Sequence, residues 1–249
     1  MSEQPFGFIG AADAYIGILT DSGQATGLEL KGNCKVFEPT PAADRKELVS
    51  TGKNTYGQVL HSVVLPKPMT AKITFDQLDQ DLFALAFFGE KSKINQAAGT
   101  IDGLKMTAIT GKWVEVGKMR LSDVEVTGAA GITYTEGEDY MFNAALGMIM
   151  ALTGGGIKDG DTIEVSASHA AVQGVLMKAM TKPNVRIRVK LDGKNMLNGR
   201  EFIAEIYSMR LNPTSAFSFI GQDFVECPFD GTLETPPGLD TPFTFAWLS

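Results

Sequence analysis

The stretch "NVRIRVKLDGKNMLNGREFIAEIYSMRL", residues 184–211, decides the fold class. Apolar residues at the odd positions 185–191 alternate with basic residues at the even positions 186–190, a period typical of a strand with one buried and one polar face. Turn residues follow, and then a second strand carries Glu201 and Glu205. Opposite charges across such a hairpin account for the basic stripe, with a subunit contact as the alternative. The pattern predicts an antiparallel β-hairpin.

Strand signals recur on both sides of this hairpin. The segment "AYIGILTDSGQATGLELKGNCKVFE" (14–38) reads as a hairpin that turns at 21–23. Four later segments fit strands bounded by Gly, Pro or Asp: "KMRLSDVEVTG" (118–128), "GDTIEVSASHAAVQGVLM" (160–177), "QDFVECPFDGTLE" (222–234) and "TPFTFAWL" (241–248). We therefore predict a mainly β protein, and 249 residues suffice for one large domain.

One segment differs from the rest: "TFDQLDQDLFALAFFGE", residues 74–90, has a helical pattern. Thr74 and Gln77 form a capping-box pattern at its start, and Gly89 suits its end. The spacing predicts a helix over 75–88. Its apolar side chains cover more than one face, and they are Leu78, Leu82, Phe83, Leu85, Phe87 and Phe88. Either the helix plugs the end of a barrel, or its second face meets a neighbouring subunit.

A long connection precedes the helix: "EPTPAADRKELVSTGKNTYGQVLHSVVLPKP", residues 38–68. Its first two dozen residues mix Pro, Ala, Gly and charges with neither a helical nor a strand period, so they read as a long loop. Loops of this length are usually functional or disordered. We expect Arg45, Lys46, Glu47 and Tyr56 to contact another subunit, although charged residues in such a loop also fit ordinary solvated surface.

Nothing in the sequence predicts catalysis. The two histidines, His61 and His169, lack partners at metal-ligand spacing. The acidic residues between 136 and 161 form no calcium loop, and the glycines at 154–156 form no phosphate loop. We expect no catalytic residue, metal or cofactor. Cys34 and Cys227 read as reduced, buried thiols, with a single disulfide as the alternative.

Charge and hydropathy restrict the partners and the location. The formal net charge of −7 disfavours gripping a polyanion such as DNA. The N-terminal segment does not read as a secretory signal, and no apolar run approaches the roughly 20 residues that span a bilayer. We expect a protein made in a cytoplasm and not inserted in a membrane.

Three stretches together resemble the major tail tube proteins of long-tailed, siphovirus-like bacteriophages. They are the long loop through "GQVLHSVVLPKPMTAKITFDQLDQDLFALAFFGE", the region from "ITYTEGEDY" to "GGGIKDGDTIEVS", and "VECPFDGTLETPPG". The likeness lies in the order of elements over most of the chain. It implies a β-sandwich or barrel with one flanking helix and a long inter-subunit loop.

The resemblance also implies a function. Six copies would close into a ring, and the rings would stack into the hollow tail tube through which phage DNA passes without specific binding. The partners would be other copies, a tape-measure protein, a tail terminator and distal tail or baseplate proteins, and the location would be the virion after assembly in the bacterial cytoplasm. Residues 40–62 would be the stacking loop and 75–88 the helix beside the sheet. Within a single domain over 1–249, residues 101–170 would be an inserted or elaborated β region on the outer surface.

Two other classes fit the same sequence. One is the inner tube of a contractile tail or a type VI-like injection system, which a co-assembling sheath protein would reveal. The other is a carbohydrate-binding or adhesin β-sandwich, in which exposed Trp113 and Trp247 would serve as sugar platforms rather than as ordinary packing.

Overall fold

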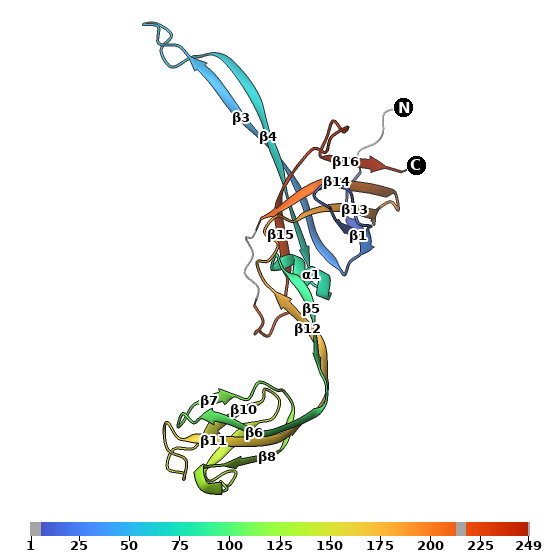
Figure 1. The fold of residues 1–249 in the computed structure, drawn as a ribbon. Coiled ribbons are helices and arrows are strands. Elements are labelled where there is room, and N and C mark those ends of the chain that lie inside the picture. The colour runs from blue at the N-terminus through green and yellow to red at the C-terminus, as the bar shows by residue number, and fades with distance from the viewer. Residues whose placement is uncertain (1–5, 213–217, 249) are drawn as a thin grey trace. The chain divides into compact units, whose positions relative to one another are not determined.

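The computed structural model describes residues 6–212 and 218–248 and divides the chain into two compact units (Figure 1). Unit 1 comprises the described residues up to Glu90 and from Met177 onward, and unit 2 is Lys91–Leu176. Most elements are strands, and the described residues contain a single α-helix, so the predicted mainly β class is confirmed. The region predicted as an elaboration, 101–170, lies inside unit 2.

Unit 1 is built on one large antiparallel sheet. Its order is β2-β1-β13-β14-β15-β4-β3, and β16 pairs with the part of β14 that β15 leaves free. The strands are β1 (Gly10–Ile18), β2 (Glu29–Leu30), β3 (Cys34–Val49), β4 (Val59–Phe75), β13 (Arg186–Asn195), β14 (Glu201–Asn212), β15 (Cys227–Leu233) and β16 (Phe243–Trp247), and the helix is α1 (Gln80–Ala86).

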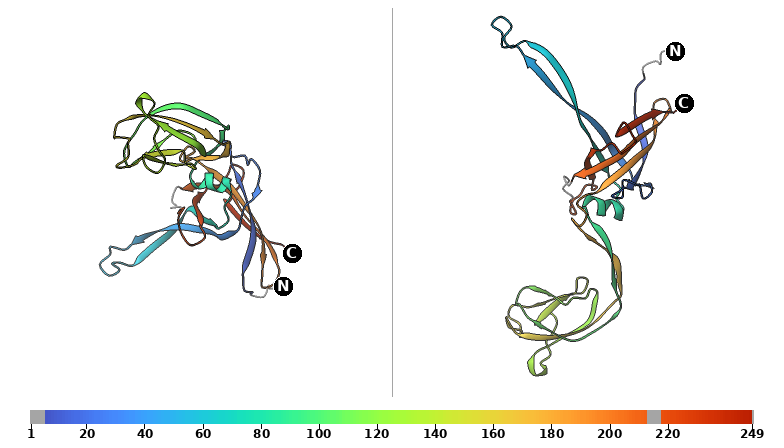
Figure 2. Two further views of the ribbon diagram at one scale, coloured as in Figure 1. Left: turned by 90° about the horizontal axis from the view of Figure 1, so that it is seen from below. Right: turned by 45° about the horizontal axis from the view of Figure 1, so that its top comes forward.

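A single core holds unit 1 together. Side chains from β1, near one end of the sheet, and from β4, near the other end, belong to the same buried cluster, with α1 packed against it. The sheet therefore curls around its apolar face. Figure 2 shows the curled sheet in two further views, with α1 at the end of unit 1 opposite the tip of the β3–β4 hairpin.

The hairpin predicted over 184–211 is confirmed. Every apolar side chain at positions 185–191 is buried, and β13 pairs with β14 along its length. The basic stripe is matched by carboxylates: Arg188 Nε donates to Glu205 at 2.7 Å, and Arg186 and Arg210 lie 3.0 and 2.8 Å from Glu234. The cross-strand explanation therefore holds for Arg188, whereas Arg186 finds its carboxylate partner outside the hairpin.

Helix α1 is shorter than predicted, and it begins with a different residue. Thr74 does not cap it, because Thr74 belongs to β4 and is buried there. The N-cap is Asp79, whose carboxylate accepts from the Leu82 N–H at 2.7 Å. At the other end the left-handed conformation falls on Phe88 and not on Gly89. Gly89 is needed for space instead, since a Cβ there would lie 2.3 Å from the Lys178 carbonyl oxygen.

The Asp79 cap should carry measurable stability. Burial alone would raise the pKa of Asp79, but hydrogen bonds from Leu82 and Lys31, with the charge of Lys31, hold it below its ordinary value of 3.8. This contribution is present above that ordinary value and is lost as the pH falls through the lowered pKa. We expect Asp79→Ala to lower the free energy of unfolding by about 1 kcal/mol in denaturant titration at pH 7.

The control for this prediction is Asp79→Asn, which keeps a capping oxygen and removes the charge. It should recover most of the loss at pH 7 and flatten the acid dependence of stability below about pH 4. Equal losses for the alanine and asparagine variants would show that Asp79 acts through its ion pair and not as a cap.

Unit 2 has its own core and two three-stranded sheets, β6-β11-β8 and β7-β10-β9. The ribbon of β5 and β12 connects it to unit 1 along the chain. The elements are β5 (Glu90–Gln96), β6 (Gly99–Thr107), β7 (Trp113–Glu115), β8 (Leu121–Thr127), the 3₁₀ helix η1 (Ala129–Gly131), β9 (Tyr140–Asn143), β10 (Met148–Ala151), β11 (Thr162–His169) and β12 (Val172–Lys178).

Two acidic turns of unit 2 are held by hydrogen bonds between carboxylates and backbone N–H groups. Asp139 accepts from the N–H groups of Thr135 and Gly156 at 2.9 and 2.7 Å. These hydrogen bonds, the first from Thr135, lower the pKa of the Asp139 carboxyl. Asp161 accepts similarly from the Lys158 N–H at 2.8 Å. The carboxylates therefore act as local turn caps.

The two cysteines are both free, as predicted. Cys34 and Cys227 lie on the strands either side of β4, each opposite Phe75. Two strand spacings, about 10 Å, separate them, which is too far for a disulfide. Burial raises the pKa of each thiol to about 11. Cys227 is buried and Cys34 half-buried, so both act as packing residues.

Candidate functional site

The long connection before the helix is a β-hairpin, not a loop. Strand β3 runs to Val49, β4 begins at Val59, and their pairing is antiparallel over almost their whole length. Only the last part of β4, Thr70–Phe75, also pairs with β15. Residues 42–67 therefore extend beyond the sheet as a free two-stranded ribbon, which we call the arm (Figure 1).

The prediction of a loop failed because prolines and charges in β3 obscured its strand character. Pro39 pairs with Ala71 on an edge strand, where a missing N–H is tolerated, and Pro41 lies where the register shifts between Thr40 and Ala42. The partner strand carries the signal that was missed. Its run "VLHSVVL", residues 59–65, has three β-branched valines and no Gly, Pro, Asn or Asp.

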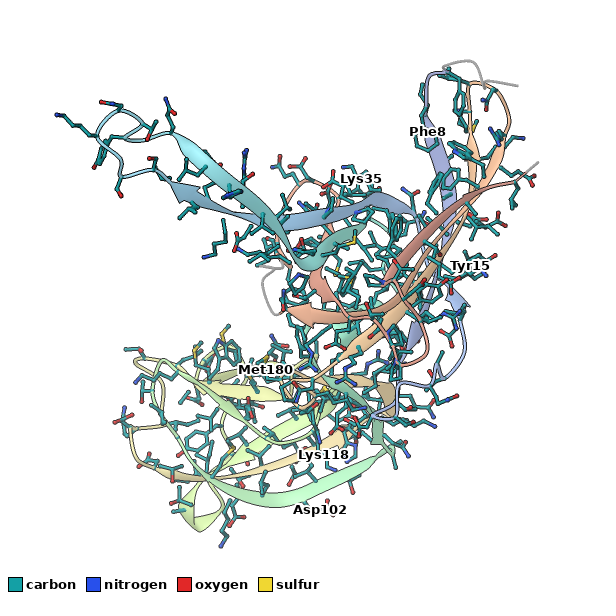
Figure 3. The ribbon with its side chains drawn as sticks, turned by 90° about the horizontal axis from the view of Figure 1, so that it is seen from above. Phe8, Tyr15, Lys35, Asp102, Lys118 and Met180 are labelled. Atoms are coloured by element: carbon teal, nitrogen blue, oxygen red, sulfur yellow. The ribbon has the colours of Figure 1, made fainter. Side chains whose placement is uncertain are left out.

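Both faces of the arm are open to solvent. Val63 and Val64 are neighbours in β4, so they point to opposite faces, yet they are 53% and 62% exposed. Leu48, Val49, Val59, Leu60 and Leu65 are exposed as well. Figure 3 shows the side chains of the arm standing out on both sides of the ribbon. An isolated two-stranded ribbon is marginally stable in water, so this surface is suited to being covered by a partner.

The residues predicted to contact another subunit all lie on the arm. Arg45, Lys46 and Glu47 are in β3, where Arg45 Nε pairs with Glu47 at 2.8 Å. Tyr56 is in the turn between the strands, and its side chain is 80% exposed. The turn is ordered by hydrogen bonds, among them Ser50 N–H to the Gln58 carbonyl at 2.8 Å. The arm therefore presents these side chains on a defined scaffold.

The arm also differs in charge from the rest of the chain. Residues 42–67 hold four basic residues (Arg45, Lys46, Lys53 and Lys67) and two acidic ones (Asp44 and Glu47), a formal charge of +2. Since the whole chain carries −7, the remainder carries −9. The arm therefore carries a formal net charge opposite in sign to that of the rest of the chain.

The predicted helix residues pack mostly within unit 1. Leu82 and Leu85 are buried in its core, and Leu78, which precedes α1, packs against the same cluster. Phe83 and Phe87 are half-buried, and the Phe87 ring stacks on Phe219 with centroids 5.9 Å apart. The helix therefore covers the core of its own sheet. Its contact with a neighbouring subunit stays a prediction.

The two tryptophans have different surroundings. Trp247 packs edge-on against Phe8 and Phe245 in an aromatic cluster of unit 1, with centroids 5.7 and 5.0 Å away. Trp113 is 42% exposed on β7 of unit 2, in register with Met150 on β10. The alternative of an aromatic platform for sugars therefore rests on Trp113.

Within residues 6–212 and 218–248, no group of three or more His, Cys, Asp and Glu side chains is placed to hold a metal ion. No helix in the described part of the chain is long and apolar enough to cross a membrane. A cavity of about 370 Å³ in unit 1 lies between β1, β3 and β16 and is lined mainly by apolar side chains, including Phe8, Phe37 and Phe202.

Comparison with known families gives one match. Residues 8–238 match the family described as protein of unknown function UCP028589. The chain belongs to this family. A search of curated proteins found no match.

Three features of the family member described here were not foreseen from its sequence. They are the strand structure of the arm, the exposure of both its faces, and three carboxylates gathered around Lys31 beside α1. The first could have been found from the β-branched run 59–65. The carboxylates around Lys31 come from positions between 29 and 81, so no local sequence pattern could predict that they lie together.

Proposed function

We propose that this protein is a structural virion protein of a long-tailed bacteriophage: it forms hexameric rings that stack into the hollow tail tube through which the DNA is delivered. By the same proposal its partners are other copies, a tape-measure protein, a tail terminator and the distal tail or baseplate proteins. Its work is mechanical, and no residue is assigned a catalytic role.

The observation that carries the proposal is the arm. An extended two-stranded ribbon is only marginally stable by itself, and this one exposes Val and Leu side chains on both faces. Exposed apolar surface of this kind is typical of a contact with a partner. A contact between an arm and a different surface of the next copy is heterologous, so it generates closed rings or open stacks. Rings that stack need two such contacts, one within the ring and one between rings.

Three further features support the same proposal. Unit 1 is a curled sheet with one helix on its core, which fits the architecture that the sequence resemblance implies. On β13, Arg188 pairs with Glu205 and Arg186 pairs with Glu234, so these two guanidinium groups are engaged within the protein and bind DNA phosphates less readily. A net charge of −7 per copy would let a polyanion slide along a wall built from many copies.

Negative-stain electron microscopy across a concentration series tests the proposal. We expect six-fold rings or hollow tubes to appear as the concentration rises, because heterologous contacts are populated by mass action. The matched control is the same series at high salt, which should weaken contacts between the basic arm and an acidic body. Monomers at every concentration and salt would contradict self-assembly, and two-fold dimers as the end state would contradict a ring.

A further inference from the structure

An apolar groove with an acidic border lies beside α1. The side chains of Ile16, Ile18, Leu82 and Leu85 line it, and its volume is about 110 Å³. Ile18 is exposed although it belongs to this apolar lining. Since an enclosed cavity of about 150 Å³ holds a benzene molecule, the open groove suits part of one aromatic ring. We call it the β2–α1 groove.

The border of the groove carries an excess of negative charge. Lys31 Nζ lies 2.9, 3.0 and 3.8 Å from carboxylate oxygens of Glu29, Asp79 and Asp81. The lysine is almost fully covered, whereas the three carboxylates are about half exposed or more. One cation against three anions leaves a charge of −2 facing solvent.

The tip of the arm has the complementary composition. The turn between β3 and β4 holds one aromatic residue, Tyr56, and one cation, Lys53. Both are exposed, and within the described residues neither makes a side-chain hydrogen bond or ion pair. Gly57 has a positive φ of 82° and lets the chain turn back directly after Tyr56. The arm tip therefore exposes the aromatic ring of Tyr56 and the ammonium group of Lys53 in the same turn.

The arm cannot deliver its tip to the groove of the same chain. Strand β3 starts at Cys34, near α1, and runs 16 residues to the tip. At about 3.3 Å per residue this distance is about 50 Å, and the paired ribbon holds it. The tip and α1, which contributes to the groove, lie at opposite ends of unit 1 in the right-hand view of Figure 2. The occupant that fits the groove is therefore a second copy.

We propose that the arm tip of one copy docks in the β2–α1 groove of the next copy, with Tyr56 against the exposed side chain of Ile18 and with Lys53 facing Glu29 and Asp81. This inference rests on the proposed function, because it requires copies to stack. It adds the surface on which the arm tip binds. Each copy offers a tip at one end of unit 1 and a groove at the other, so a pair of docked copies still has one unoccupied tip and one unoccupied groove. The contact adds copies in one direction.

Site-specific cross-linking tests the inference on the full chain. In an Asn54→Cys, Thr26→Cys double variant, one cysteine lies on the tip beside Tyr56 and the other at the groove. A short bis-maleimide should link successive copies into a ladder on a denaturing gel. The single variants Asn54→Cys and Thr26→Cys are the matched controls, and they also report any reaction of Cys34 and Cys227. We expect the ladder only in the double variant.

A charge swap gives a second, independent measurement. Lys53→Glu and Glu29→Lys should each raise the concentration needed for half-assembly by about tenfold, and the combined variant should recover most of that loss. Unchanged circular dichroism and melting temperature would show that the single variants still fold.

The outcomes separate the two proposals. Tubes that form without a ladder, and without rescue by the charge swap, would overturn the groove as the receiving surface and leave the tube standing. Ladders and rescue in assemblies that are not tubes would support the docking and contradict the proposed function. A wild-type chain that never assembles, with no ladder at any concentration, would overturn both.

Discussion

Removing the arm should leave a folded protein that no longer forms long tubes. The change replaces residues 43–66 by Asn-Gly, which joins Ala42 to Lys67, two residues that face each other in the ladder. An Asn-Gly turn closes a two-stranded hairpin well, so the rest of β3 and β4 should keep its register. Since no residue from 43 to 66 belongs to the core of unit 1, its melting temperature should change little. Electron microscopy and sedimentation should show rings or monomers, but no long tubes, at concentrations where the wild type forms tubes.

A point-variant pair refines the same prediction. Val63→Thr with Val64→Thr keeps β-branched side chains but removes apolar surface from both faces of the arm, so it should weaken assembly while the ribbon persists. The matched control is Val175→Thr, an exposed valine on β12 in unit 2, which should assemble as the wild type does. Long tubes from the shortened chain would refute the role of the arm, whatever the point variants do.

Local periodicity predicted the hairpin of β13 and β14 because each strand there has one buried and one polar face. The buried residues of 185–191 recur at every second position, and the sheet uses that alternation directly. The same reasoning fails to predict the strands of the arm, because neither face of the arm is buried in a single copy. Val63, Val64 and Leu65 form a continuous apolar run, whereas a strand at the surface is expected to alternate apolar and polar residues. Such a run is typical of a strand that is covered on both faces.

The helix shows a second limit of local reasoning. Thr74 and Gln77 match a capping box, but β4 continues through Thr74 because its neighbours Ile73 and Phe75 are buried in the core and pair with β15. Tertiary burial of two large side chains outweighs a cap that contributes about 1 kcal/mol. Asp79 then takes the capping role, aided by Lys31, a residue 48 positions earlier that the fold brings within 3.0 Å.

The β2–α1 groove could not be foreseen for a related reason. Its apolar side comes from β1 and α1, while its acidic border combines Glu29 with Asp79 and Asp81. The sequence places these residues about 50 positions apart, and only the curl of the sheet makes them neighbours. The sequence shows that Asp79 and Asp81 lie near the start of the helix. It does not show that they share a surface with residues of two other segments, so the acidic border could not be predicted.

Leu82→Asp should strongly destabilise unit 1. Leu82 is 0% exposed and lies in the main core, so the change removes a packed side chain and buries a carboxylate without a partner. Truncation of a buried leucine alone costs about 2–5 kcal/mol, and an unpaired buried charge adds to that cost. For a unit of this size we expect the melting temperature to fall by about 10 °C or more, or the unit not to fold. Calorimetry is the suitable measurement, because unit 2 has a separate core and should keep its own transition.

The controls decide whether Leu82 acts through the core or through a subunit contact. Gln80→Asp adds the same charge two residues earlier at an exposed position, and it should change stability by no more than about 0.5 kcal/mol. Leu82→Met keeps volume and apolar character, so it should cost less than about 1.5 kcal/mol and assemble normally.

If Leu82→Asp left the melting temperature of unit 1 unchanged and only abolished assembly, the helix would be an interface element whose buried face is not needed for folding. If it changed neither, the packing of α1 on the sheet would be contradicted. A loss of both, with Gln80→Asp unaffected, would follow from the core position of Leu82, because the groove that receives the arm is built on the same side chain.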